Sequence, residues 1–196
     1  MSLRRFLNRR AALGFTLTEL LAVATMLGTV SSGTYMRAKE KGVETECKNN
    51  LQQIGQALVM YINENGEFPK AAFYPKDPIK GADSIRNMIT GIPEQMWVCP
   101  SLPDALKKKG LGFVYNDELG GHKDFSDPGK KWVLIEINCV SASAPAPHPG
   151  GYNVLFADGH VITTRRLPNK ITEAQQASLD KLEHQFGQDA VKVASR

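Results

Sequence analysis

One uninterrupted stretch near the start of the chain constrains the fold more than any other feature of the sequence. Residues 15–36 are mainly apolar and include a single charged side chain, Glu19. From Val43 the apolar residues recur every three or four positions, which is typical of a helix with one buried face. The residues of this stripe are Val43, Cys47, Leu51, Ile54, Leu58, Tyr61 and Ile62. The sequence therefore predicts one long helix whose two halves, residues 15–36 and 37–65, meet different surroundings.

The end of this helix is marked by residues that stop helices. Asn65-Gly66 favours a C-terminal cap, and Pro69 cannot continue the helical hydrogen-bond pattern. A helix from about Phe15 to Asn63 would be about 75 Å long. Residues 66–196 then remain for a globular part built around the second half of the helix.

The net charge of the chain is concentrated in its first residues. The formal net charge is +4 at pH 7, and residues 1–14 hold four arginines and no acid, which accounts for all of it. These arginines are Arg4, Arg5, Arg9 and Arg10. The remainder has no basic excess, and the short run Lys107–Lys109 is more typical of a solvated surface than of a phosphate-binding track. Nucleic acid is therefore not an expected partner.

The apolar segment has the length of a membrane-spanning helix. About 20 mainly apolar residues cross a bilayer, and residues 15–36 provide them, with weaker apolar character over residues 29–34. Because basic residues that precede a span stay on the cytoplasmic side, the arginines predict a cytoplasmic N-terminus and an exported remainder. We therefore expect a single-pass protein of the bacterial inner membrane with a periplasmic C-terminal part.

Two kinds of export signal also combine a basic head with a short apolar run. An ordinary cleaved signal peptide is one, and the pairs Arg4-Arg5 and Arg9-Arg10 suggest a twin-arginine signal as the other. Glu19 argues against both. A carboxylate near the centre of a membrane segment costs about 2.5–3.5 kcal/mol on insertion scales and less near an end, so a partner for it is expected.

The residues around Glu19 supply such a partner through a family resemblance. The sequence GFTLTELL, Gly14 to Leu21, resembles the processing site of type IV pilins and of type II secretion pseudopilins. The resemblance implies that a prepilin peptidase cuts after Gly14 and that Phe15 is then N-methylated. It also implies that Glu19, the fifth residue of the mature chain, pairs with the α-amino group of a neighbouring subunit, so that neither buried charge stands alone.

The same resemblance implies an architecture and a function. The stretch CKNNLQQIGQALVMYINENGEFP, residues 47–69, is similar to the corresponding part of major pseudopilins. The implied protein is not an enzyme but a filament subunit with a leader peptide at residues 1–14. It would assemble with itself and other pseudopilins on an inner-membrane platform. Secretion, adhesion, motility and DNA uptake all stay open as the role of that filament.

The middle of the chain is irregular in pattern and holds one of three cysteines. Prolines interrupt residues 66–112, with short helical turns expected near Asp83–Thr90 and Leu102–Lys109. Such a long connection needs tethering. A disulfide between Cys47 and Cys99 would provide it, but Cys139 is an equally permissible partner and three buried free thiols are an alternative. No cysteine pair has the CxxC spacing of common metal sites.

The last third of the chain carries the strand signals. Runs rich in β-branched and aromatic residues predict strands at residues 112–115, 132–137, 153–157 and 160–164. Asp158-Gly159 between the last two runs favours a hairpin with a type I′ turn, in which both central residues have positive φ. Residues 141–149 are expected to form an exposed loop, and Thr172 with Gln175 to cap a helix to about Phe186. The fold class is therefore α+β, with a long helix on a small antiparallel sheet and a short C-terminal helix.

One further motif lies in this region. His148 precedes Asp158-Gly159 by nine intervening residues. This H-x9-DG arrangement resembles a signature near the C-terminus of many prepilin-like proteins, where it implies a structural hairpin rather than chemistry.

Three hypotheses remain as alternatives to a filament subunit without a cofactor. His148, Asp158 and His160 are ligand types for zinc or iron, so an anchored or exported metal-binding protein or hydrolase is the main alternative function. Acids in a glycine-rich loop offer oxygens for calcium, although no cofactor is expected: Asp117, Glu118, Asp124 and Asp127. The third is a soluble periplasmic domain released by signal peptidase.

Overall fold

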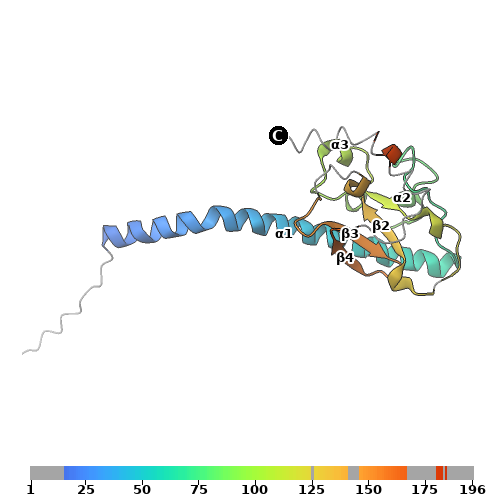
Figure 1. The fold of residues 1–196 in the computed structure, drawn as a ribbon, viewed down its shortest axis with the longest axis horizontal. Coiled ribbons are helices and arrows are strands. Elements are labelled where there is room, and N and C mark those ends of the chain that lie inside the picture. The colour runs from blue at the N-terminus through green and yellow to red at the C-terminus, as the bar shows by residue number, and fades with distance from the viewer. Residues whose placement is uncertain (1–15, 125, 141–145, 167–179, 183, 185–196) are drawn as a thin grey trace, which may run out of the picture. The chain divides into compact units, whose positions relative to one another are not determined.

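The computed structural model describes residues 16–124, 126–140, 146–166, 180–182 and 184, with side-chain surroundings for all of them except 27–32 and 140. The chain divides into two compact units, Met1–Lys39 and Glu40–Arg196. One helix, α1 (Leu17–Asn65), contributes residues to both units. Figure 1 shows α1 together with the elements of the second unit.

The bounds of α1 agree with the helix that the sequence predicts. It has 49 residues and ends at Asn65, where the N–H of Gly66 donates to the carbonyl oxygen of Ile62 over 2.8 Å. Gly66 has φ +70°, the left-handed conformation that ends many helices and that glycine adopts at low cost. The stop signal in the sequence is thus a cap in the structure.

The C-terminal unit is built on an antiparallel sheet with strand order β1-β2-β3-β4. Its strands are β1 (Phe113–Tyr115), β2 (Trp132–Glu136), β3 (Tyr152–Phe156) and β4 (Val161–Thr164). Each strand pairs with the next along the chain, and the β2–β3 pairing is irregular between Trp132 and Leu134. The four predicted strands and the α+β class are confirmed.

The second half of α1 packs on this sheet through the predicted stripe. Leu51, Ile54 and Leu58 are fully buried and share one core cluster with Leu134 and Leu155 of the sheet. Gly55 permits the close approach, because a Cβ there would lie 2.7 Å from Leu155 Cδ1 and 3.3 Å from Gly159 Cα. The helix therefore contacts the β3–β4 hairpin without an intervening side chain.

A second core cluster contains the alternate residues of the strands. Val114, Ile135 and Val154 belong to it, whereas their neighbours Phe113 and Leu155 belong to the first cluster, as the alternation of side chains along strands requires. Short elements of the segment before β1 contribute to the second cluster through Leu102 and Leu106. Both faces of the sheet are covered, which explains why every residue of β2 is buried.

The remaining elements are short. They are α2 (Ile85–Met88), η1 (Glu94–Trp97), α3 (Asp104–Lys107), η2 (Asp117–Leu119), η3 (Pro128–Lys130) and η4 (Ile137–Val140). The first and third of these lie within the predicted helical turns. Most of the predicted C-terminal helix, and residues 141–145 of the predicted loop, lie outside the described residues, although residues 180–182 and 184 are helical.

The membrane span expected over residues 15–36 is not confirmed. Among the residues that the structure describes, no helix combines the length and the apolar character that a membrane crossing requires.

Candidate functional site

In the first turn of α1, Glu19 caps the start of the helix, which the sequence analysis did not predict. The Glu19 carboxylate accepts hydrogen bonds from the backbone N–H and the hydroxyl of Thr16, both over 2.8 Å. In return, the Glu19 N–H donates to the Thr16 hydroxyl over 3.3 Å. This reciprocal arrangement is a capping box, in which a threonine and a glutamate three residues later satisfy free N–H groups at the helix start. Gly14 and Phe15 lie outside the described residues.

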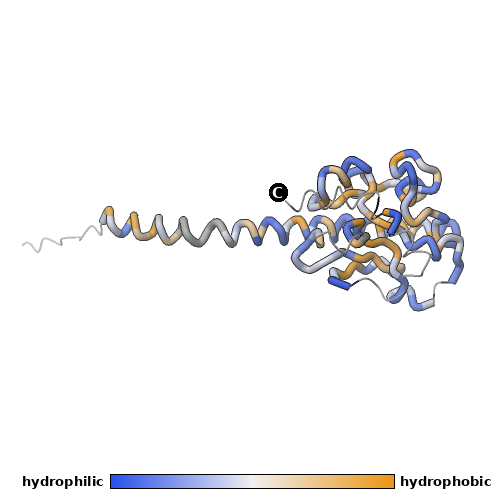
Figure 2. Tube along the Cα trace, turned by 45° about the horizontal axis from the view of Figure 1, so that its top comes forward, coloured by the Kyte–Doolittle hydropathy of each residue, from blue (hydrophilic) through white to orange (hydrophobic). Residues whose placement is uncertain are grey.

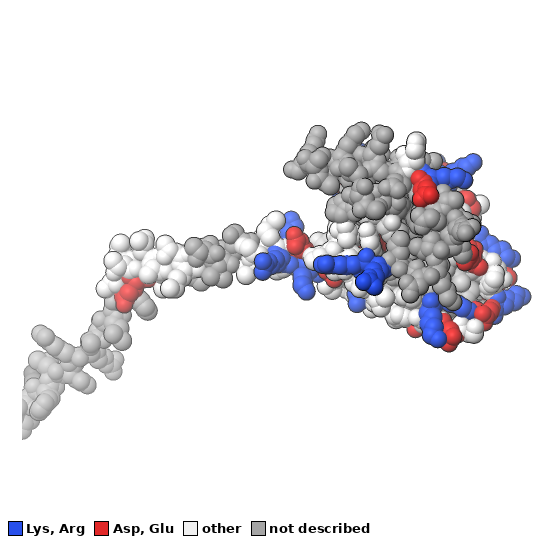
Figure 3. All heavy atoms as spheres, in the orientation of Figure 1, with Lys and Arg blue, Asp and Glu red and all other residues white. Residues whose placement is uncertain are grey.

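The same part of α1 exposes large apolar side chains. Leu17 is 82% exposed and Met26 73% exposed. Other exposed apolar residues of this part are Leu20, Leu21, Val23, Tyr35 and Met36. Figure 2 shows apolar residues recurring along it, and Figure 3 shows how few charges it carries. The described residues of this part of α1 therefore present an exposed apolar surface.

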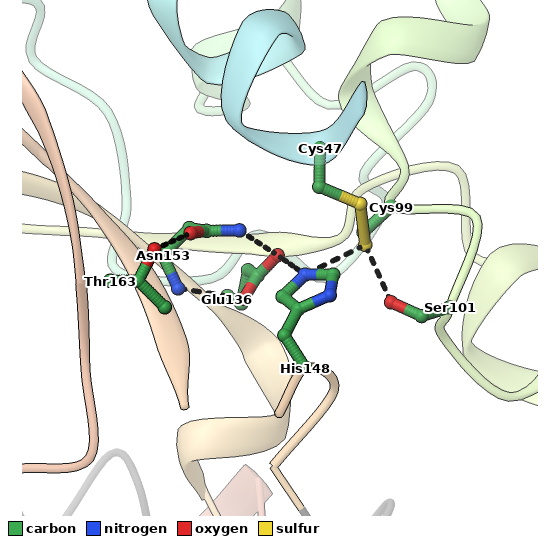
Figure 4. The surroundings of a disulfide bond; sticks show 7 residues. All are labelled: Cys47, Cys99, Ser101, Glu136, His148, Asn153 and Thr163. Carbon is green, nitrogen blue, oxygen red and sulfur yellow. Dashed lines mark hydrogen bonds and ion pairs between the residues drawn. A yellow bond between two sulfur atoms is a disulfide. The ribbon is translucent and has the colours of Figure 1, made fainter. Parts of the chain in front are cut away.

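The motif histidine lies in a buried polar network in the C-terminal unit (Figure 4). His148 Nε2 is 2.8 Å from Glu136 Oε1. Asn153 donates to the same carboxylate twice, from its backbone N–H over 2.8 Å and from Nδ2 over 3.2 Å. The hydroxyl of Thr163 donates to Asn153 Oδ1 over 2.8 Å. Three donors thus converge on one buried carboxylate, which satisfies a group that would be costly to bury alone.

A disulfide lies directly beside this network. Cys47 of α1 and Cys99 are joined with a Cα–Cα separation of 5.3 Å, so the structure has the pairing that would tether the irregular segment to the helix. Cys99 Sγ is 3.5 Å from His148 Nε2 and 2.9 Å from the hydroxyl of Ser101. Cys139 is a buried free thiol, and burial, followed by the charge of Glu136, raises its pKa well above the usual range. This burial makes Cys139 a poor nucleophile.

The Asp158-Gly159 turn differs from the predicted type I′ turn. Only Gly159, with φ +86°, has a positive φ. The Gly159 N–H donates to the Phe156 carbonyl oxygen over 2.9 Å, and the Phe156 N–H donates to that of His160 over 3.0 Å. The loop therefore has three residues and ends in one left-handed glycine, a common hairpin connection. A three-residue loop replaces the two-residue one because Ala157 is part of the turn and not of β3.

His160 and Asp158 interact with each other on this exposed turn. Asp158 Oδ1 accepts hydrogen bonds from the His160 backbone N–H, over 3.1 Å, and from His160 Nδ1. Partial burial works to raise the pKa of Asp158, but the hydrogen bonds and charge of His160 outweigh it and the net pKa is lowered. His160 also stacks on Phe156. These contacts give both residues a structural role in the turn.

The structure does not assemble the alternative metal site considered at His148, Asp158 and His160. His148 lies before β3 and Asp158 after it, so the strand separates them. The four acids considered for calcium form no group with metal-ligand geometry among the described residues, and Asp124 pairs with Lys131 over 2.9 Å and Asp127 with Lys130 over 3.3 Å. The hydrogen bond from Lys131 lowers the pKa of Asp124 strongly. Within the described residues, the group with metal-ligand geometry is instead Cys47, Cys99, Glu136 and His148.

Two central members of this network were missed at the sequence level. Glu136 is a single acid inside the apolar run Trp132–Ile137, which is a signal, because a charge in a buried strand requires partners. Asn153 carries no comparable signal. It follows His148 by five residues in a segment where polar residues are ordinary. Comparisons with protein-family models, with curated proteins and with solved structures returned no match.

Proposed function

We propose that this protein is a structural subunit of a pilin-like filament, made as a precursor and assembled through the first half of α1. The observation that carries the proposal is the exposed apolar surface of residues 17–26 and 33–36, which has one charged side chain, Glu19. An apolar surface of this kind favours lipid or other apolar helices over water. Before assembly the bilayer would hold it, and in the filament the equivalent helices of other subunits would cover it.

The second half of α1 supports the same proposal. It forms one wall of the globular unit, so any force on the first half reaches a domain that is tied to the helix by core packing and by the Cys47–Cys99 disulfide. A continuous 49-residue helix gives the subunit an assembly segment and a domain scaffold in one element.

The capping box sharpens the proposed role of Glu19. If a peptidase cuts after Gly14, Thr16 becomes the second residue, and the new α-amino group lies one residue before the capped turn. The local hydrogen bonds from Thr16 then hold the carboxylate at the helix start, where it would present charge to the amine of a neighbouring subunit. Capping and intersubunit pairing are separable, because a glutamine accepts the same hydrogen bonds but carries no charge.

The first experiment identifies the mature N-terminus. The full-length chain is expressed with a prepilin peptidase, and the membrane-associated product is examined by intact mass and N-terminal sequencing. We expect it to begin at Phe15 and to carry one N-methyl group. A Gly14→Glu variant should keep the 14-residue leader. A mature protein that begins after Ser32, with the apolar segment discarded, would contradict the proposal.

The second experiment separates charge from capping. Glu19→Gln retains the cap and loses the charge, whereas Thr16→Val loses the two hydrogen bonds of the hydroxyl, keeps the one from the backbone N–H and retains the charge. Filaments are sheared from cells that contain the assembly platform and are collected by ultracentrifugation. We expect Glu19→Gln to lower filament yield at least about tenfold, since loss of one buried ion pair costs several kcal/mol, and Thr16→Val to lower it much less. Equal yields from Glu19→Gln and the wild type would refute the intersubunit role.

A further inference from the structure

Four side chains of the metal-ligating types converge beside the disulfide. They are Cys47, Cys99, Glu136 and His148; all are buried, and one ligand atom from each lies within 4.8 Å of every other. They come from α1, the segment between η1 and α3, the last residue of β2 and the turn before β3. A disulfide alone needs neither an imidazole nor a carboxylate for its stability. The composition of the cluster therefore calls for a second explanation.

Two distances between ligand atoms in the cluster are close to those of a tetrahedral zinc site. Zinc bonds of about 2.3 Å to sulfur and 2.0–2.1 Å to nitrogen, at tetrahedral angles, place sulfur and nitrogen about 3.5 Å apart. Cys99 Sγ and His148 Nε2 are 3.5 Å apart. The carboxylate oxygen is 2.8 Å from the same nitrogen and would retreat to about 3.4 Å. The two sulfurs must separate, which breaking their bond allows, and the remaining pairs of ligand atoms, which lie within 4.8 Å of one another, must come to about 3.5 Å.

The surrounding residues already hold the two non-sulfur ligands. Asn153 donates two hydrogen bonds to the Glu136 carboxylate, and Thr163 in turn orients Asn153. Hydrogen bonds of this kind from outside the ligand set fix ligand orientation and raise metal affinity in known sites. His148 is 4% exposed and Glu136 is fully buried, so water does not compete for either position.

We propose that the reduced form of this cluster binds one zinc ion through Cys47 Sγ, Cys99 Sγ, His148 Nε2 and a Glu136 carboxylate oxygen. No short metal-binding sequence motif contains these four ligands, because they are far apart in the sequence. The proposal is independent of the filament function, since it rests on the C-terminal unit alone.

The chemistry of the change balances with a dithiol as reductant. The dithiol gives two electrons and two protons to the Cys47–Cys99 bond, which becomes two thiols, and the dithiol itself closes to a disulfide. Zinc then displaces the two thiol protons to solvent. The proton that His148 Nε2 shares with Glu136 in the disulfide form leaves to solvent and Nδ1 takes one up, so the imidazole stays neutral and the Nε2 lone pair is left for the metal. Both states join α1 to the segment that contains Cys99, so this tether persists through the redox change, and the zinc form would add a link to β2 through Glu136.

Zinc titration of the full-length chain tests the proposal. The protein, purified in mild detergent, is reduced with a dithiol, freed of the reductant by anaerobic gel filtration and titrated with zinc chloride; an oxidised sample is treated in parallel. We expect about one zinc per reduced chain and less than about one tenth per oxidised chain, together with a higher melting temperature for the zinc-loaded reduced protein. A reduced protein that binds no zinc, whether folded or unfolded, overturns the proposal.

Matched histidine variants identify the ligands. His148→Gln should weaken zinc binding at least about tenfold, whereas His160→Gln, which alters the histidine of the exposed turn, and Cys139→Ser, which alters the free thiol, should leave it unchanged. Zinc bound equally well by His148→Gln would assign the metal to the thiols alone and overturn the four-ligand site.

X-ray absorption of the zinc-loaded wild type gives a reading that does not depend on whether any variant folds. Two sulfur ligands at about 2.3 Å and two nitrogen or oxygen ligands at about 2.0–2.1 Å are expected. A shell of four sulfurs from two chains, or a shell without sulfur, overturns the proposal.

Discussion

The two halves of α1 have the same backbone conformation but opposite surroundings. Among the described residues of the first half, the leucines and methionines are exposed, whereas Leu51, Ile54 and Leu58 of the second half are buried against a sheet. In the second half the partner belongs to the same chain, so the stripe explains a domain core. The described apolar side chains of the first half are exposed, and in the proposed filament the helices of other subunits would cover them. Because the backbone is helical in both halves, the proposed function rests on which apolar side chains are exposed and which are buried.

The largest expected change in stability comes from removing the Cys47–Cys99 disulfide, which ties the second half of α1 to the rest of its unit. The bond closes a loop with a sequence separation of 52 residues, for which chain-entropy arguments give about 4 kcal/mol of stability. Cys47→Ser combined with Cys99→Ser should lower the free energy of unfolding by about that amount. Urea unfolding, with a chelator present, is followed through the fluorescence of Trp97 and Trp132, both buried in this unit.

Cys139→Ser is the matched control for this change, since it alters a cysteine that forms no disulfide. If the double variant loses less than about 1 kcal/mol in its free energy of unfolding, core packing alone fixes the irregular segment, residues 66–112, to α1.

A pair of identical substitutions tests the comparison directly. Leu51→Ala creates a cavity in the core and should cost about 2–5 kcal/mol in the same unfolding assay. Leu20→Ala, at a side chain that is 61% exposed, should change the free energy of unfolding by less than about 0.5 kcal/mol. Filament yield should respond to Leu20→Ala if the proposed assembly surface is right. Equal stability losses for the two variants would mean that the first half also packs within its own chain.

Local periodicity made much of this fold predictable. The helix stripe, its stop at Asn65 and the four strands follow from patterns within a few residues, and the structure contains all of them. The network was not predictable, because Glu136, His148 and Asn153 meet only when β2 and β3 pair. The choice between Cys99 and Cys139 as partner of Cys47 likewise depends on where the chain brings residues that are distant in sequence.

The two glutamates offer a smaller contrast between the regions. Glu136→Gln removes the charge at the centre of the buried network and places an amide nitrogen, a donor, where donors already converge. We expect a loss of about 1–3 kcal/mol in the free energy of unfolding of the C-terminal unit. Glu19→Gln, in the exposed half, should leave that free energy unchanged. A neutral Glu136→Gln variant would show that the network adds specificity and little stability.

The smallest expected effect concerns the turn on which the buried half of α1 packs. The hydrogen bonds and charge of His160 lower the pKa of Asp158 in the folded protein, so the folded state binds this proton less readily than the unfolded state does. The resulting stability is present above the unfolded pKa of about 3.9 and is lost as the pH falls through the lower folded value. Because the Asp158 side chain is 39% exposed, solvent screening limits the contribution to a few tenths of a kcal/mol.

Asp158→Asn isolates this charge, because the asparagine oxygen still accepts the hydrogen bond from the His160 N–H that shapes the turn. Unfolding free energies measured from pH 6 down to pH 2 should therefore fall slightly less steeply for the variant than for the wild type. Lys130→Gln, which changes another exposed charge that pairs within its own turn, serves as the control. A steeper acid loss in Asp158→Asn would show that the aspartate is held protonated at the turn, which would reverse the assigned direction of its pKa.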